Sequence, residues 1–143
     1  MKIIFDSKEK TVVKFEKGDN CLVLLTAIAK KRDASFNFNM IGGCASVDLA
    51  FFHVGDKKYI VKSFTPGYSG NIEILNVNGN VAWFDGSPVM HAHGVFSDEE
   101  YKCFGGHIMK MTISITGETF IHWLPKKLSR ELDNEMCLKL LSK

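Results

Sequence analysis

The fold of this chain is constrained most by one helical segment followed by a long succession of segments with strand character. Apolar residues recur at helical spacing from Cys21 to Ala29. From Phe36 to Met40 apolar and polar residues alternate, and residues typical of strands then prevail as far as Leu124. We therefore predict an α+β fold, in which a large antiparallel sheet packs against one main helix.

Capping residues predict where the helix begins and ends. Residues 12–15 indicate a first strand, and Asp19 is suited to be the N-cap of the helix that follows. The basic cluster Lys30-Lys31-Arg32 falls in the last helical turn, where cations interact favourably with the helix dipole. We interpret this cluster as a solvated helix end rather than as a nucleic-acid site.

Glycine-containing pairs mark positions where strands turn or bend. Gly42-Gly43 predicts a bend or a close approach of backbone, and Asp85-Gly86 predicts a turn. Asn78-Gly79 is compatible with a hairpin turn or with a kink inside one long strand. Residues 128–141 are compatible with either a helix or a strand.

Length and composition are those of one domain, which we expect to span residues 1–143. Hydrophobic residues make up 45% and charged residues 24% of the chain, a balance typical of soluble globular proteins. No apolar run reaches the roughly 18 residues that a membrane span requires, and the early charges Lys2 and Asp6 do not suit a secretory signal. We therefore expect a cytoplasmic protein.

The cysteines predict reduced thiols rather than a cysteine metal site or a disulfide framework. They are widely spaced and include no Cys-x-x-Cys pair. In a cytoplasmic protein such residues are most simply partly buried free thiols. The cysteines are Cys21, Cys44, Cys103 and Cys137.

Three histidines, His91, His93 and His107, form a candidate metal site. Residues two apart in a strand point to the same face, so His91 and His93 project together. If Asp98-Glu99-Glu100 is a three-residue hairpin loop centred on Glu99, His107 lies opposite His91 on the neighbouring strand. Facing residues have Cβ atoms about 4.5–5.5 Å apart, so a metal ion about 2.0–2.1 Å from each imidazole nitrogen fits between the rings.

This prediction depends on the parity of the hairpin. A two-residue loop would shift the register by one and turn His107 to the opposite face. Gly105 and Gly106, which precede His107, indicate a bulge or a close approach, and a bulge would also change the parity. The alternative is a group of surface or hydrogen-bonded histidines, which is how we interpret His53 and His122.

Imidazole ligands suit zinc, copper, iron and nickel alike, and zinc is the metal that we expect. No fourth protein ligand is evident from the sequence. Cys103 precedes His107 by about 13 Å of extended strand, which makes it a poor candidate for the same ion.

Three segments, in this order, resemble the PPC domain, the plant- and prokaryote-conserved domain. They are residues 70–80 (GNIEILNVNGN), 88–93 (PVMHAH) and 105–107 (GGH). The upstream order of strand, helix and a strand containing Gly42-Gly43 is also similar, so the resemblance covers nearly the whole chain. It implies a PPC-like fold, assembly as a homotrimer, and a metal site made of His91, His93 and His107.

The resemblance also implies a connection with DNA. Plant relatives join the domain to an AT-hook and act as DNA-binding nuclear regulators. This chain contains no Arg-Gly-Arg-Pro hook, whose arginines read a narrow minor groove. The plant element Gly-Arg-Phe-Glu-Ile-Leu is replaced here by Gly-Asn-Ile-Glu-Ile-Leu at residues 70–75.

Three classes of function follow from these residues. The first is a homotrimeric, zinc-bearing binding or regulatory module. The second is a zinc-dependent, hydrolase-type enzyme acting on an unknown small molecule, with Glu73, Asp85 or Glu99 as a possible base; a cupin-like oxygenase or isomerase is a related form of this hypothesis. The third is DNA binding, for which a net charge of +2 predicts weak, salt-sensitive contacts through Lys57-Lys58 and Lys126-Lys127.

Overall fold

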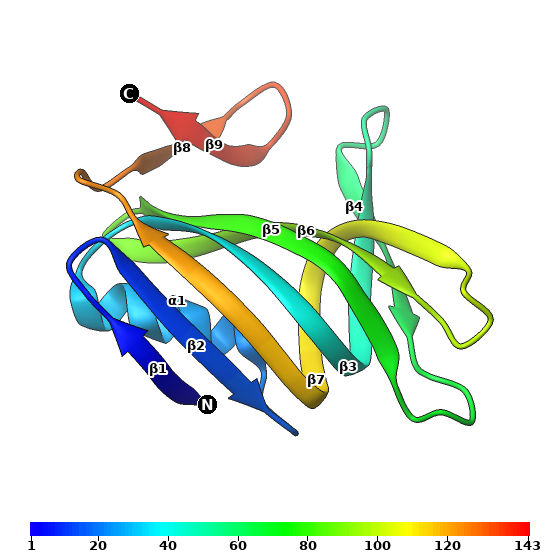
Figure 1. Ribbon diagram of the computed structural model, residues 1–143. Coiled ribbons are helices and arrows are strands. Elements are labelled where there is room, and N and C mark those ends of the chain that lie inside the picture. Colours follow the sequence, from blue (N-terminus) through cyan, green and yellow to red (C-terminus); the bar gives the residue numbers. More distant parts are fainter.

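The computed structural model describes residues 1–143 and contains one helix and a 9-stranded sheet (Figure 1). The predicted antiparallel sheet and single main helix are both present, but the fold is dominated by the sheet rather than being an even α+β mixture. The elements are β1 (Lys2–Asp6), β2 (Lys10–Glu16), α1 (Cys21–Arg32), β3 (Phe36–His53), β4 (Lys58–Phe64), β5 (Ile72–Phe84), β6 (Ser87–Ser97), β7 (Cys103–Trp123), β8 (Ser129–Asp133) and β9 (Leu138–Ser142).

Strand pairing forms a closed circuit. β3 pairs with both β5 and β7, β5 pairs with β6, and β6 pairs back with β7, all antiparallel. β2 pairs with the far end of β7, and β1, which the sequence did not predict, pairs with β2. β4 pairs with the end of β3. The circuit brings β6, β7 and the β3–β4 hairpin together, and this is where the candidate site lies.

The core is built on one face of the alternating strands. Phe36, Phe38 and Met40 of β3 are buried, whereas Asn37 and Asn39 between them are exposed, as the alternation predicts. Removing such apolar side chains from water is the main stabilising contribution to folding. Helix α1 packs against this core through one face, which carries Cys21, Leu25 and Ala29.

Helix α1 is capped by a different residue from the one predicted. Asn20, not Asp19, is the N-cap, and its side-chain oxygen accepts a hydrogen bond from the Val23 N–H at 3.3 Å. Asp19 instead accepts a hydrogen bond from the backbone N–H of Glu16 at 2.9 Å. The three predicted cations do occupy the last turn. The helix has neither the length nor the apolar character of a membrane-crossing segment.

The glycine pairs mark a turn and two features inside strands. Asp85-Gly86 forms the turn between β5 and β6, as predicted. Asn78-Gly79 lies inside β5, so the alternative of one long strand is correct. Gly42 lies at a register shift in β3, and a Cβ atom there would be 2.1 Å from the Thr116 carbonyl oxygen. This contact confirms the close backbone approach predicted for Gly42-Gly43.

The C-terminal segment, compatible with helix or strand in the sequence, forms the β8–β9 hairpin. Figure 1 shows this hairpin above the sheet and away from α1. It joins the sheet through a single parallel pair, Trp83 of β5 with Ser129 of β8. Because so few ladder hydrogen bonds hold the hairpin, its position depends on side-chain contacts, above all those of Arg130.

All four cysteines are free, as predicted. Cys21 and Cys44 are buried, and burial raises the pKa of each thiol to about 12. Both are therefore neutral at physiological pH and behave as small core side chains.

Candidate metal centre

The three histidines lie on the two strands of the β6–β7 hairpin. His91 and His93 belong to β6 and His107 belongs to β7. Ala92 and Ile108, their neighbours in sequence, are buried in the core. Because successive side chains of a strand point to opposite faces, all three imidazoles are directed away from the core on the same face.

The register of this hairpin differs from the predicted one, but its parity is the same. His107 pairs with His93 rather than with His91, since the loop comprises residues 98–102 instead of a three-residue turn. Asp98 holds the longer loop by accepting two backbone hydrogen bonds within it, each 2.9 Å long. A displacement of two residues keeps His107 on the predicted face.

Glycines allow β6 and β7 to approach closely beside His107. No register shift interrupts the pairing of the two strands, so close approach rather than a bulge explains Gly105 and Gly106. A Cβ atom on Gly105 would lie 2.5 Å from the carbonyl oxygen of Gly94 on β6. A side chain at this position would therefore push apart the two strands that carry the histidines.

The ring nitrogens of His91, His93 and His107, called here the histidine cluster, converge on one point. Nε2 of His93 lies 3.1 Å from Nε2 of His91 and 3.4 Å from Nδ1 of His107. One potential ligand atom from each residue lies within 4.8 Å of the others. Three nitrogens bound to a tetrahedral ion at about 2.0–2.1 Å are about 3.3–3.4 Å apart, so the donors present fit a metal ion.

Burial and mutual repulsion favour the neutral form of the cluster. Burial lowers the pKa of His107 to about 4, and the neighbouring His91 and His93 contribute in the same direction. The pKa of His91 is also lowered, first by burial and then by the charges of His93 and Arg130. At pH 7 His91 and His107 therefore offer lone pairs, as metal ligation requires.

Tyr59 of β4 fixes the plane of the His107 ring. The two rings stack with their centroids 4.9 Å apart and their planes 25° from parallel. Phe52, the cross-strand partner of Tyr59 on β3, packs edge-to-face against the tyrosine ring, with the two ring centroids 5.1 Å apart. Sequence reasoning missed Tyr59, because β4 reaches the histidine cluster only through the pairing of β3 with both β4 and β7.

Asparagines of neighbouring strands surround the other two histidines. Asn80 is the cross-strand partner of His91, and Asn78 is the partner of His93. Together with Asn37 they line a pocket of about 280 Å³ that contains no hydrophobic residue. These amides provide hydrogen-bonding groups beside the cluster but add no charge to it.

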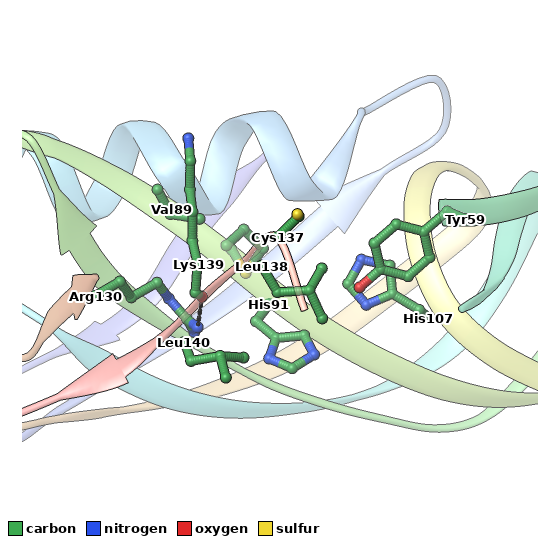
Figure 2. Close-up of a pocket in the computed structure, with 10 residues that line it drawn as sticks. Tyr59, Val89, His91, His107, Arg130, Cys137, Leu138, Lys139 and Leu140 are labelled. Atoms are coloured by element: carbon green, nitrogen blue, oxygen red, sulfur yellow. Dashed lines mark hydrogen bonds between the residues drawn. The ribbon is translucent and has the colours of Figure 1, made fainter. Parts of the chain in front are cut away.

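A second pocket, of about 310 Å³, also reaches the cluster, and we call it the Arg130 pocket (Figure 2). Figure 2 shows the Arg130 side chain extending from β8 toward His91, while His107 and Tyr59 lie at the other end. In the sequence, Arg130 stands out only as part of a basic cluster with Lys126-Lys127, and nothing there connects it with the histidines, because the secondary structure of its segment was undecided.

The three acids considered as catalytic bases lie outside the histidine cluster. Glu73 accepts a hydrogen bond from the Asn71 side chain, and Glu99 accepts one from the Ser69 N–H, both at 2.7 Å. Both acids line a separate pocket. Asp85 lies in the turn between β5 and β6. The cluster therefore contains imidazoles alone.

The remaining histidines, and the cysteine nearest to the cluster in sequence, stand apart from the cluster, as predicted. His53 lies in the β3–β4 region with its Nδ1 3.3 Å from an Asp56 oxygen. His122 is exposed on β7. Cys103 is exposed at the start of β7 and is absent from the cluster.

Several basic residues considered for nucleic-acid contacts have acidic neighbours of their own. Lys127 donates to Asp33 at 2.5 Å and its ammonium lies 4.0 Å from the centroid of the Trp83 ring. Lys58 lies 3.5 Å from Asp56. These exposed pairs reduce the local positive charge.

Known proteins resemble this chain over most of its length. The family model described as the Plants and Prokaryotes Conserved (PCC) domain matches residues 4–125. No curated protein matches the chain.

Solved structures share the same fold. A "putative DNA-binding protein" from Ralstonia eutropha JMP134 is 27% identical with a TM-score of 0.88, over 97% of this chain and 94% of that chain. A plant- and prokaryote-conserved (PPC) protein from Pyrococcus horikoshii is 25% identical with a TM-score of 0.84, over 98% and 95%. A metal-containing protein from Archaeoglobus fulgidus is 20% identical with a TM-score of 0.84, over 100% of both chains, a similarity of fold alone.

Proposed function

This chain belongs to the Plants and Prokaryotes Conserved (PCC) domain family, and from that premise we propose that it is a metal-binding module. His91, His93 and His107 are its proposed ligands, and one divalent transition-metal ion, zinc before others, is the proposed occupant. The name of the Archaeoglobus fulgidus protein, which is called metal-containing, agrees with this proposal.

The observation that carries the proposal is the approach of two ring nitrogens to Nε2 of His93, at 3.1 and 3.4 Å. One imidazole nitrogen offers either one proton or one lone pair, so it does not make two good hydrogen bonds to neutral neighbours at once. A cation at the centre would accept a lone pair from all three rings. Zinc is favoured because three neutral imidazoles are a common zinc donor set.

Metal analysis of the purified protein tests this proposal. We expect close to one zinc per chain in the native protein and its loss in His91→Ala, His93→Ala or His107→Ala. His53→Ala and His122→Ala are matched controls, because both remove a histidine outside the cluster and should leave the metal content unchanged. Native protein without bound metal at neutral pH would defeat the proposal.

Assembly as a homotrimer is part of the proposed function. Phe51 and Ile60 are cross-strand partners on β3 and β4, and they are 72% and 54% exposed in the single chain. Exposed apolar pairs of this kind are typical of surfaces that are covered by another chain. Sedimentation velocity should give the mass of three chains for the native protein and a lower mass for Phe51→Ser with Ile60→Ser. A native monomer at micromolar concentration would exclude the trimer.

The pocket beside the histidines favours a second candidate, a zinc-dependent enzyme of the hydrolase type. A bound zinc ion would supply a Lewis acid and a water molecule of lowered pKa. The chain itself would orient a small molecule in the Arg130 pocket, between Arg130 and Tyr59. Esters, lactones and phosphoesters are suitable test substrates, each with and without a chelator. Hydrolysis rates that do not respond to chelation would count against this candidate.

DNA binding is a third candidate, supported by the description of the Ralstonia eutropha structure. With a net charge of +2, binding would depend on local contacts to phosphates and would weaken steeply with salt. A mobility-shift titration at two salt concentrations tests this candidate. Binding that is absent even at low salt would exclude it.

A further inference from the structure

Arg130 is a buried cation without an acidic partner. Its side chain belongs to a residue that is only 6% exposed, yet no carboxylate lies within ion-pair distance of the guanidinium. Nη1 donates to the Lys139 carbonyl oxygen at 2.9 Å and Nη2 donates to the Asn80 side-chain oxygen at 2.7 Å. Both acceptors are neutral, and the buried Nε has no acceptor at all.

A buried, uncompensated charge is costly to a fold and is normally paired with an opposite charge. A guanidinium carries five N–H groups, of which two have protein acceptors here. A neutral donor would make the same two hydrogen bonds to Asn80 and Lys139. These bonds therefore do not explain why a permanently charged side chain occupies this position. The missing partner is therefore an anion.

The Arg130 pocket provides the space for that anion. No aspartate or glutamate lines it. Lys139 also lines it, but its ammonium lies 4.3 Å from the centroid of the Phe84 ring, which is not part of the pocket. The field inside the pocket therefore favours negative ligands, and a metal ion at the histidine cluster would strengthen this preference.

The remaining walls are apolar. Val89, Met90, Leu138 and Leu140 line the pocket between the guanidinium and the histidines. The planar fork of an arginine matches a carboxylate, which accepts two parallel N–H groups. Apolar walls next to this fork suit a ligand with a short hydrocarbon body.

We propose that the Arg130 pocket binds a small organic monocarboxylate, with its carboxylate on the Arg130 guanidinium and its apolar body directed toward the histidine cluster. This inference rests on the proposed metal centre for the orientation of the ligand. It names the class of small molecule that the same site would receive.

Calorimetric titration of the zinc-loaded protein tests the proposal with butyrate and benzoate as probes. Butyramide and benzamide are the matched neutral probes, and we expect each amide to bind at least about tenfold more weakly than its acid. Arg130→Met should lose at least about tenfold in carboxylate affinity. Lys126→Met, which removes an exposed cation outside the pocket, should bind as the native protein does.

A second variant separates ligand binding from a merely structural role of Arg130. Arg130→Lys keeps a positive charge at this position but loses the planar fork, so it should retain part of the carboxylate affinity that Arg130→Met loses, even if both variants lower the unfolding midpoint. If the two variants lose affinity equally and in proportion to their loss of stability, Arg130 has only a structural role and the proposal fails. Equal binding of acids and amides would also overturn it.

Metal analysis of the same samples distinguishes this proposal from the metal centre. Protein that holds zinc but binds no carboxylate overturns the present inference alone. Carboxylate binding by protein that holds no metal overturns only the metal centre. If chelation abolishes carboxylate binding and Arg130→Met leaves it intact, the carboxylate is bound by the metal. This result would overturn the assignment of the carboxylate to Arg130.

Discussion

The imidazole of His107 lies against the phenol ring of Tyr59, with 4.9 Å between the ring centroids and 25° between the ring planes. The two residues come from β7 and β4, strands that do not pair with each other and are joined only through β3. The stack therefore links the proposed ligand to a hairpin at the edge of the sheet. It restricts rotation of the imidazole and keeps Nδ1 directed toward His93.

Replacement of Tyr59 should weaken zinc binding without removing a ligand. We expect Tyr59→Ala to lower zinc affinity about tenfold, the usual scale for groups that orient a ligand, and Tyr59→Phe to retain it. Competition against a chromophoric chelator measures the affinity. Tyr68→Ala is the control, since Tyr68 is fully exposed. Equal affinity of Tyr59→Ala and native protein would show that the stack does not orient His107.

Metal-free protein should lose stability as the pH falls from about 6.5 to about 4. The pKa of His107 is lowered from 6.5 to about 4 by burial and by His91 and His93. Above pH 6.5 the residue is neutral in both states and contributes nothing to the pH dependence. Below it, the unfolded chain takes up a proton that the folded chain refuses, so protonation favours unfolding.

The measurement is the urea midpoint of chelated protein at several pH values. Because His107 is partly exposed, solvent screening reduces the expected loss to roughly 1 kcal/mol. His107→Gln removes the titrating group and should show a smaller loss over the same interval. Parallel pH curves for the two proteins would contradict this explanation.

A side chain at position 79 should separate the strands beneath the histidines. A Cβ atom on Gly79 would lie 2.6 Å from the His91 carbonyl oxygen and 2.6 Å from a ring carbon of Phe38. We expect Gly79→Ala to cost about 1–3 kcal/mol of unfolding free energy, the scale of an overpacked core, and to lower zinc affinity. Gly55→Ala is the control, because a Cβ atom there makes only ordinary contacts. Chemical denaturation measures both variants.

Of the three cations at the end of α1, Arg32 alone should matter for stability. Its guanidinium contacts Asp6 at 2.9 Å and the carbonyl oxygens of Ser7 and Lys8, and it lies 4.4 Å from the centroid of the Trp123 ring. We expect Arg32→Ala to lose about 1–2 kcal/mol. Lys31→Ala should change stability by less than about 0.5 kcal/mol. Equal effects in thermal unfolding would show that the contacts of Arg32 carry no net stability.

Local patterns predicted the parts of the site that depend on strand periodicity. His91 and His93 share a face because they are two residues apart, and His107 joins them because the hairpin register has even parity. The actual partner of His107 is His93, because hydrogen bonds to Asp98 stabilise a longer loop than the sequence suggested. The error of two residues left the side-chain directions unchanged.

Local sequence patterns could not predict that Tyr59 and Arg130 lie beside the histidines. Each reaches the histidines through strands distant in sequence, by way of β3 for Tyr59 and by way of β5 for Arg130. The residues around Arg130 show no clear period, so even their secondary structure was undecided. The sequence could not decide between Asp19 and Asn20 as the helix N-cap, because either side chain can accept the capping hydrogen bond. The backbone conformation places Asn20 at the cap and turns Asp19 toward the Glu16 N–H.

The β8–β9 hairpin lies beyond residue 125, where the match to the family model ends, whereas all three histidines lie within the match. The two ends of the Arg130 pocket are thus encoded in separable stretches of the gene. Mutation can therefore change the Arg130 side of the pocket without changing the three histidines, so the choice of bound small molecule can vary independently of the proposed metal ligands. Grafting residues 126–143 from one relative onto another offers a laboratory route to such a change.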